Sequence, residues 1–148
     1  MKSKLLSALV LAFALILVAV PTFAASSTYD YVISYTVNGK KTGEYHTLSS
    51  GSAKISGYSY YNGSSDPGAV ISAKGEDVTY QLYKDDSFFD SYYGSVKQNV
   101  SASSSPTNVD NFSGTFPNKL GSSSSKYYLV ITKANNGWHM KGHGTLSN

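Results

Sequence analysis

Two of the three histidines lie close together near the end of the chain, in the stretch NNGWHMKGH. On a β-strand His139 and His143 would share one face, about 13 Å apart at roughly 3.3 Å per residue. One metal ion needs both imidazole nitrogens within about 2.1 Å of it, and a straight strand cannot bring them that close. Lys141 lies between them on the same face and adds a repulsive charge. The spacing therefore argues against a metal centre.

The same stretch has the alternation of a closing strand. Trp138 and Met140 fall on the face opposite the histidines, so we expect both to point into the core while the histidines stay exposed. A tight bend at Gly142 with His46 nearby is the arrangement that would restore a metal site. We expect no metal-binding residues.

Acidic side chains gather at Glu76 and Asp77, and again at Asp85, Asp86 and Asp90. A glycosidase would need two carboxyl groups about 5 to 9.5 Å apart, and calcium would need several oxygens converging in one loop. Lysines flank both acidic groups, which favours solvated turns. A Ca²⁺ site near Asp85, Asp86 and Asp90 is a minor alternative, and no other cofactor is expected.

Nucleophilic catalysis has little support in the sequence. No Gly-x-Ser-x-Gly nucleophile elbow occurs. Residues 123–126 formally match Ser-x-x-Lys, but a match inside a run of serines carries little information. The chain has no cysteine, which excludes thiol nucleophiles, thiolate metal sites and disulfides. We expect no catalytic residues and a non-enzymatic protein.

Tyrosine is the residue in excess, with 13 in the chain. Several form doublets, and adjacent strand residues face opposite sides, so each doublet should send one ring to the core and one toward water. Exposed tyrosines combine an apolar ring with a polar tip, which suits sugars, peptides or other proteins. Cross-strand pairing that only stabilises the sheet is the alternative. The predicted contact residues are Tyr58, Tyr60, Tyr61, Tyr92 and Tyr93.

The elements that must position these side chains are β-strands. Residues 29–37, YDYVISYTV, alternate with period two and predict a half-buried strand. Asn38 and Gly39 follow, and both tolerate the positive φ of a tight hairpin turn. Residues 40–48 are therefore expected to return as the paired strand. The side chains predicted to share one face of the first strand are Tyr29, Tyr31, Ile33, Tyr35 and Val37.

Short extended segments spaced by turns continue to the end of the chain, with no helical period after residue 25. About eight or nine strands result, which predicts one all-β domain. We expect an antiparallel β-sandwich of the jelly-roll or immunoglobulin-like type, without disulfides, and a closed β-barrel is the alternative. The later strands are expected over residues 53–61, 69–73, 78–83, 87–100, 112–116, 127–133 and 138–146.

The first 24 residues have the pattern of a cleaved secretory signal peptide. Lys2 and Lys4 precede an apolar run of about 16 residues, Pro21 breaks the run, and small residues precede an expected cut after Ala24. A membrane-spanning helix needs roughly 20 apolar residues, so an uncleaved anchor is the less favoured alternative. We expect residues 25–148 to be an extracellular domain with no stable membrane insertion after cleavage.

The charge pattern limits the partners. All 12 basic residues are lysine and two lie in the signal, so the remaining ten nearly balance the nine carboxylates. Arginine is absent, and its guanidinium group is the preferred bidentate hydrogen-bond donor to phosphates and base edges. Nucleic acid is therefore not an expected partner.

The leading hypothesis is a secreted binding protein that meets an extracellular glycan or protein surface, such as a cell-wall polysaccharide, through exposed tyrosines. A small exported antimicrobial or toxin protein is the alternative. A small secreted hydrolase using Asp85, Asp86 or Asp90 is less favoured.

Overall fold

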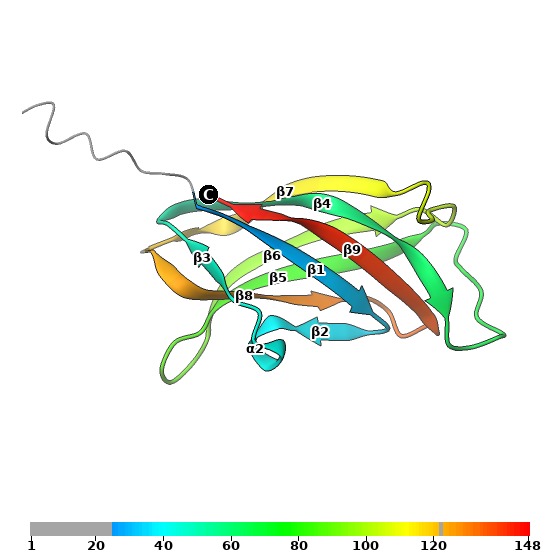
Figure 1. Cartoon of the computed structure of the whole chain (residues 1–148), viewed down its shortest axis with the longest axis horizontal. Helices are drawn as coiled ribbons and strands as arrows, with labels where there is room; N and C mark the ends of the chain where they lie inside the picture. Colours follow the sequence, from blue (N-terminus) through cyan, green and yellow to red (C-terminus); the bar gives the residue numbers. More distant parts are fainter. Residues whose placement is uncertain (1–24, 122) are drawn as a thin grey trace, which may run out of the picture.

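The computed structural model describes residues 25–121 and 123–148, and the predicted signal peptide lies outside them. The strands are β1 (Ser26–Ile33), β2 (Thr36–Asn38), β3 (His46–Leu48), β4 (Gly51–Ser64), β5 (Glu76–Lys84), β6 (Ser91–Val100), β7 (Asp110–Leu120), β8 (Ser124–Thr132) and β9 (Trp138–Ser147). Sheet A has the order β1-β9-β4-β7. Sheet B has the order β2-β8-β5-β6, with β3 also paired to β8. The two antiparallel sheets confirm the predicted sandwich (Figure 1), and they do not close into one barrel.

The predicted alternation at the start of the chain is confirmed over β1. Tyr29, Tyr31 and Ile33 are all buried between the sheets. The continuation through Tyr35 is wrong, because β1 ends at Ile33 and the chain crosses to sheet B as β2, leaving the Tyr35 side chain 58% exposed. One extended stretch of sequence thus supplies strands to both layers.

The predicted hairpin at Asn38 and Gly39 is wrong. Asn38 instead caps the short helix α2 (Gly39–Thr42), and its Oδ1 accepts a hydrogen bond from the Lys40 amide at 3.0 Å. Gly43 ends the helix in the left-handed region, at φ 79°. Strands β2 and β3 both pair with β8 and not with each other. Asparagine stabilises helix N-caps as well as tight turns, and here the cap prevails.

A buried hydrogen-bond network joins the two sheets and satisfies the hydroxyls of two core tyrosines, Tyr31 and Tyr80. The Tyr31 hydroxyl lies 2.7 Å from Ser59 Oγ and 2.8 Å from the Tyr80 hydroxyl. Gln98 Oε1 accepts from Ser59 at 2.6 Å and from Tyr80 at 2.8 Å. The Gln98 amide donates to the Asp110 carbonyl at 2.7 Å. Because a buried hydroxyl without a partner is costly, these mutual contacts allow Tyr31 and Tyr80 to serve as core residues.

Candidate binding surfaces

The outer face of sheet A brings together side chains from all four of its strands. Asp30 of β1 lies opposite His143 of β9, which lies opposite Tyr58 of β4, and Tyr58 lies opposite Asn111 of β7. His143 Nδ1 is 2.8 Å from Asp30 Oδ1. The ring centroids of Tyr58 and His143 are 5.8 Å apart. We call this line of four side chains, with the neighbouring Tyr60, the aromatic row.

Tyr58 and Tyr60 share this outer face, as their spacing predicted. Their rings are near parallel, with an interplanar angle of 20° and centroids 6.4 Å apart. Both rings are half-buried among their neighbours. Both residues belong to β4, a central strand of sheet A. Within the described residues, neither hydroxyl has a hydrogen-bond partner. The sheet therefore holds the two rings in place, while their hydroxyls stay free to bond to a ligand.

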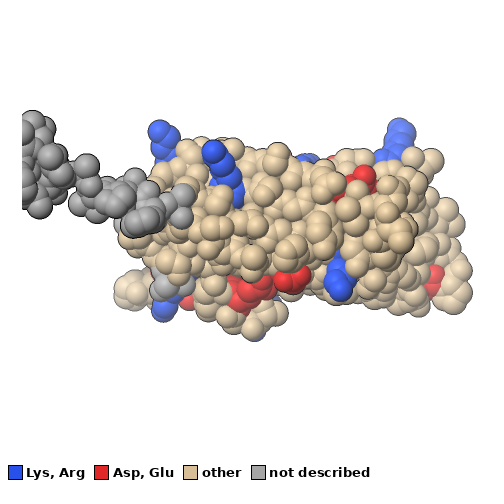
Figure 2. Space-filling model, turned by 45° about the horizontal axis from the view of Figure 1, so that its top comes forward, with Lys and Arg blue, Asp and Glu red and all other residues tan. Residues whose placement is uncertain are grey.

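Beside the aromatic row, the same face has a shallow depression of about 250 Å³. Short hydroxyl side chains from three neighbouring strands line it. Ser56 pairs with Ser113, and Thr115 and Ser147 lie on either side of Lys54. The view in Figure 2, which brings forward the side where β4 and β7 lie in Figure 1, shows wide uncharged areas and isolated lysines. The face thus combines an aromatic edge with a hydroxyl-lined floor.

Tyr61 is buried and Tyr93 is partly buried, so the structure does not place these two predicted contact residues beside Tyr58 and Tyr60 on an open face. Tyr61 is only 5% exposed, and its ring packs edge-on against Trp138 with centroids 5.8 Å apart. Burial raises the pKa of Tyr61 to about 12. Tyr93 is half-buried against the core, and its ring packs edge-on against Tyr127 at 5.6 Å. Tyr61 is the inward member of its doublet by strand alternation. Tyr93 turns toward the core at a register shift, where Leu82 pairs with Gly94 and Tyr83 with Tyr92.

Tyr92 is exposed, as predicted, but lies on sheet B and not beside Tyr58. It belongs to a line of four rings across the outer face of that sheet. The successive ring centroids are 5.1 Å apart for Tyr92 and Tyr83, 5.5 Å for Tyr83 and Tyr128, and 6.3 Å for Tyr128 and Tyr45. Tyr92 is 48% exposed and Tyr128 only 3%. The structure therefore divides the predicted contact residues between two opposite surfaces.

Sequence reasoning missed several members of both surfaces. Tyr45 and Tyr83 stand alone in the sequence, so a search for doublets passes over them. The strand parity of β5, with Val78 and Tyr80 inward, was enough to place Tyr83 outward. Nothing local identifies Asn111 as a neighbour of Tyr58, or Asp30 as a neighbour of His143, since they come from other strands.

The aspartates considered for calcium or acid–base chemistry are held by lysine ammonium groups. Lys40 Nζ lies 2.8 Å from Asp85 Oδ1 and 2.7 Å from Asp90 Oδ1, so it occupies the place between them that a cation would take. Asp86 pairs with Lys84 at 2.8 Å. Hydrogen bonds from Lys40 lower the pKa of Asp85 and Asp90, and the Lys84 contact lowers that of Asp86. A general acid needs the opposite shift.

The histidines do not converge. His139 Nδ1 lies 2.7 Å from Ser34 Oγ on the outer side, and Met140 is buried as predicted, with Trp138 half-buried against the core. His46 is buried at β3, where its Nδ1 lies 2.9 Å from Ser27 Oγ. Across residues 25–121 and 123–148, no three His, Cys, Asp or Glu side chains lie close enough to hold one metal ion.

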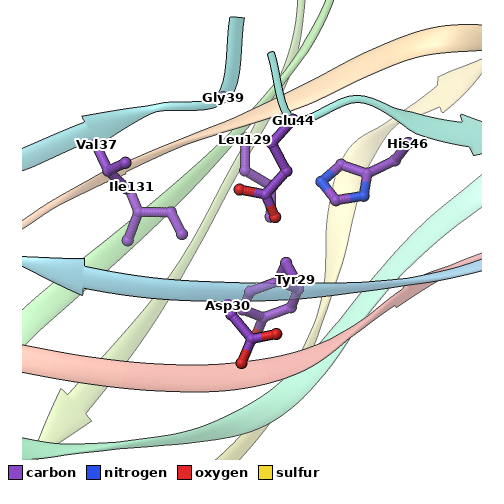
Figure 3. Close-up of a pocket in the computed structure, with 8 residues that line it drawn as sticks. All are labelled: Tyr29, Asp30, Val37, Gly39, Glu44, His46, Leu129 and Ile131. Carbon is purple, nitrogen blue, oxygen red and sulfur yellow. The ribbon is translucent and has the colours of Figure 1, made fainter. Parts of the chain in front are cut away.

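A small cavity opens between β1 and β3 at the edge of the sandwich. Figure 3 shows the Glu44 carboxyl group and the His46 ring on one side of it, with Tyr29 and Asp30 on the other. Its volume is about 10 Å³, room for a single water molecule. Burial raises the pKa of Glu44 and lowers that of His46. The cavity is too small to be a ligand site.

No known protein-family model matches the chain, and no curated protein is significantly similar to it. Among the described residues, no helix is long and apolar enough to cross a bilayer.

Proposed function

We propose that the protein is an extracellular, non-enzymatic binding protein that recognises a polysaccharide on the outer face of sheet A. The observation that carries the proposal is the pair of Tyr58 and Tyr60, two near-parallel phenol rings with unpartnered hydroxyls, beside a hydroxyl-lined depression.

The chemistry of a sugar matches both parts of this face. A pyranose ring has an apolar face of C–H groups, which packs against an aromatic ring, and an edge of hydroxyls that both donate and accept hydrogen bonds. Serine and threonine hydroxyls can do the same, and those of Ser56 and Ser113 line the depression. Asn111 and the paired Asp30 and His143 add a mixed set of donors and acceptors at the aromatic row. An open face can accommodate an extended chain of sugars better than a closed pocket can.

The test is retention of residues 25–148 by a panel of insoluble and arrayed polysaccharides. The double variant Tyr58→Ala/Tyr60→Ala should bind about ten- to a hundredfold more weakly, since each ring supplies of the order of 1 kcal/mol of contact and tenfold corresponds to about 1.4 kcal/mol. A second variant, Ser113→Leu, fills the depression and should also weaken binding.

Tyr92→Ala is the matched control, because it removes an exposed tyrosine from the opposite sheet and should bind like the wild type. The proposal is wrong if no polysaccharide in the panel retains the protein. It is equally wrong if Tyr92→Ala weakens retention as much as the double variant.

A further inference from the structure

A buried lysine lies in the loop that joins β8 to β9, where the chain passes from sheet B to sheet A. The Lys133 side chain is 0% exposed, and the Glu76 side chain, at the start of β5, is 7% exposed. Lys133 Nζ lies 3.3 Å from Glu76 Oε1. Taking an ammonium group and a carboxylate out of water costs free energy even when the two are paired, so their burial is weak evidence of a purely stabilising role.

The Asn136 side chain contacts both of these groups. Lys133 Nζ donates to Asn136 Oδ1 at 2.8 Å, and Asn136 Nδ2 donates to Glu76 Oε2 at 3.1 Å. The bond from Oδ1 to the amide carbon is about 1.2 Å long, so Lys133 Nζ lies no more than about 4 Å from that carbon. Atoms that are poised to react lie about 3 to 3.5 Å apart. A small movement of the lysine side chain therefore brings its nitrogen against the amide carbon.

The groups around the amide can assist an acyl transfer. Within the described residues, Glu76 Oε1 has no hydrogen-bond partner, so it is free to accept a proton from the lysine. Glu76 Oε2 contacts the amide nitrogen that would leave, so one carboxylate reaches both the nucleophile and the leaving group, as a general acid–base must. The backbone amide of Trp138 donates to Asn136 Oδ1 at 3.3 Å. Negative charge develops on this oxygen when the carbon is attacked, and the donor stabilises it.

The loop is held in this arrangement by contacts outside the reacting groups. The Gly137 carbonyl accepts a hydrogen bond from the Ser65 amide at 2.9 Å, which ties the loop to the end of β4. Lys133 Nζ also donates to the Ser34 carbonyl at 3.2 Å and to the Ala134 carbonyl at 2.5 Å. Groups that are oriented in advance react much faster than the same groups free in solution.

We propose that Lys133 and Asn136 join in an intramolecular isopeptide bond after the chain has folded. Lys133 passes a proton to Glu76, and the neutral amine attacks the amide carbon of Asn136. A bond from Nζ to this carbon forms, the bond from the carbon to Nδ2 breaks, and Nδ2 leaves as ammonia. The lysine nitrogen loses two protons: one completes the ammonia, and the other converts it to ammonium. The charges and atoms balance without an oxidant, a metal ion or a further reactant.

The bond replaces a buried charge with a neutral amide and links the end of β8 to the start of β9 through side chains. A disulfide cannot form this link, because the chain has no cysteine. The Asn136 side chain is only partly buried, which gives the ammonia a way out. The reaction does not involve the outer face of sheet A, so this proposal does not depend on glycan binding.

The test is the intact mass of residues 25–148, which contain both sheets, followed by digestion of the unfolded protein with trypsin. The wild type should be lighter than its sequence requires by the mass of one NH₃. Trypsin should not cleave after Lys133, because the ammonium group is gone, and residues 127–141 should appear as one peptide that lacks one NH₃. Separate peptides of residues 127–133 and 134–141, both at full mass, would overturn the proposal.

Two variants test the assigned roles. Lys133→Met removes the nucleophile and Glu76→Gln removes the base while keeping the shape of the side chain, so both should have their full mass. Lys40→Met is the matched control, because it removes an exposed lysine that contacts carboxylates, and it should still lack one NH₃. Loss of NH₃ from Lys133→Met or Glu76→Gln would contradict the mechanism. The wild-type mass is decisive even if a variant does not fold.

A succinimide is the competing product, because an asparagine followed by a glycine can cyclise onto the next backbone nitrogen and also lose one NH₃. A succinimide at Asn136 would form in Lys133→Met as well, would leave Lys133 open to trypsin, and would be cleaved by hydroxylamine. Any of these three results would overturn the isopeptide assignment. A peptide of residues 127–141 that lacks one NH₃ and resists hydroxylamine would support it.

Discussion

The outer faces of both sheets carry tyrosines, two on sheet A and a line of four on sheet B, but use them differently. On sheet B, the hydroxyls of Tyr128 and Tyr45 donate to Asp90 and Asp85, and the Tyr128 ring is almost wholly covered. On sheet A, the hydroxyls of Tyr58 and Tyr60 have no partner within the described residues.

The difference shows that the position of a ring on an outer face does not decide its role. A tyrosine with a covered ring and a hydrogen-bonded hydroxyl stabilises the fold. A tyrosine whose ring packs on its neighbours but whose hydroxyl has no partner remains available to a ligand. On sheet B, Tyr128 meets the first description and is therefore mainly structural.

The strongest test of this contrast compares alanine substitutions on the two faces. Tyr128→Ala should lower the free energy of unfolding by about 3 kcal/mol, because it empties a covered site between Tyr45 and Tyr83. Tyr58→Ala should cost about 1 kcal/mol or less, since its ring lies on an open face. Urea denaturation of both variants measures the difference, and equal losses would contradict the assignment of separate roles.

The buried histidine of sheet B gives a smaller, pH-dependent effect. Burial lowers the pKa of His46 from its ordinary 6.5, so below that pH the unfolded chain takes up a proton that the folded protein does not. Stability should therefore fall as the pH drops below about 6.5. His46→Gln should reduce this slope in thermal unfolding at several pH values.

His143→Gln serves as the control for the opposite surface, because His143 lies on the outer face of sheet A and not in the core. It should retain the slope that His46→Gln loses. A slope that survives in His46→Gln would show that another group is responsible.

The smallest expected effect is that of Lys40→Met, which removes the ammonium group between Asp85 and Asp90. These groups are exposed to water, so the loss of stability should be slight and should fade at high salt. Lys40 lowers the pKa of both aspartates, so its contribution is present above about pH 3.8 and disappears as the pH falls below that value. Melting temperatures at several pH and salt values measure it; an effect as large as that of Tyr128→Ala would be unexpected.

Much of the strand content was predictable, but several boundaries were not. Residues 69–73 were expected to form a strand and belong to a loop, because a short apolar run has no partner there. The strand expected over residues 112–116 is longer in the structure, and Pro117 lies inside β7. Strand β7 is at the edge of sheet A, where a missing amide donor is tolerated. Edge position is a property of the assembled sheet and cannot be read locally.

The sequence by itself determined which side chains share a face, because side-chain direction on a strand alternates whatever the strand pairs with. It placed Tyr29 and Tyr31 together, Tyr58 with Tyr60, and His139 with His143. Only the tertiary structure decided which faces meet. Asp30 and His143 are 113 positions apart in the chain, and their contact depends on the pairing of β1 with β9, a non-local choice made by burial of the whole core.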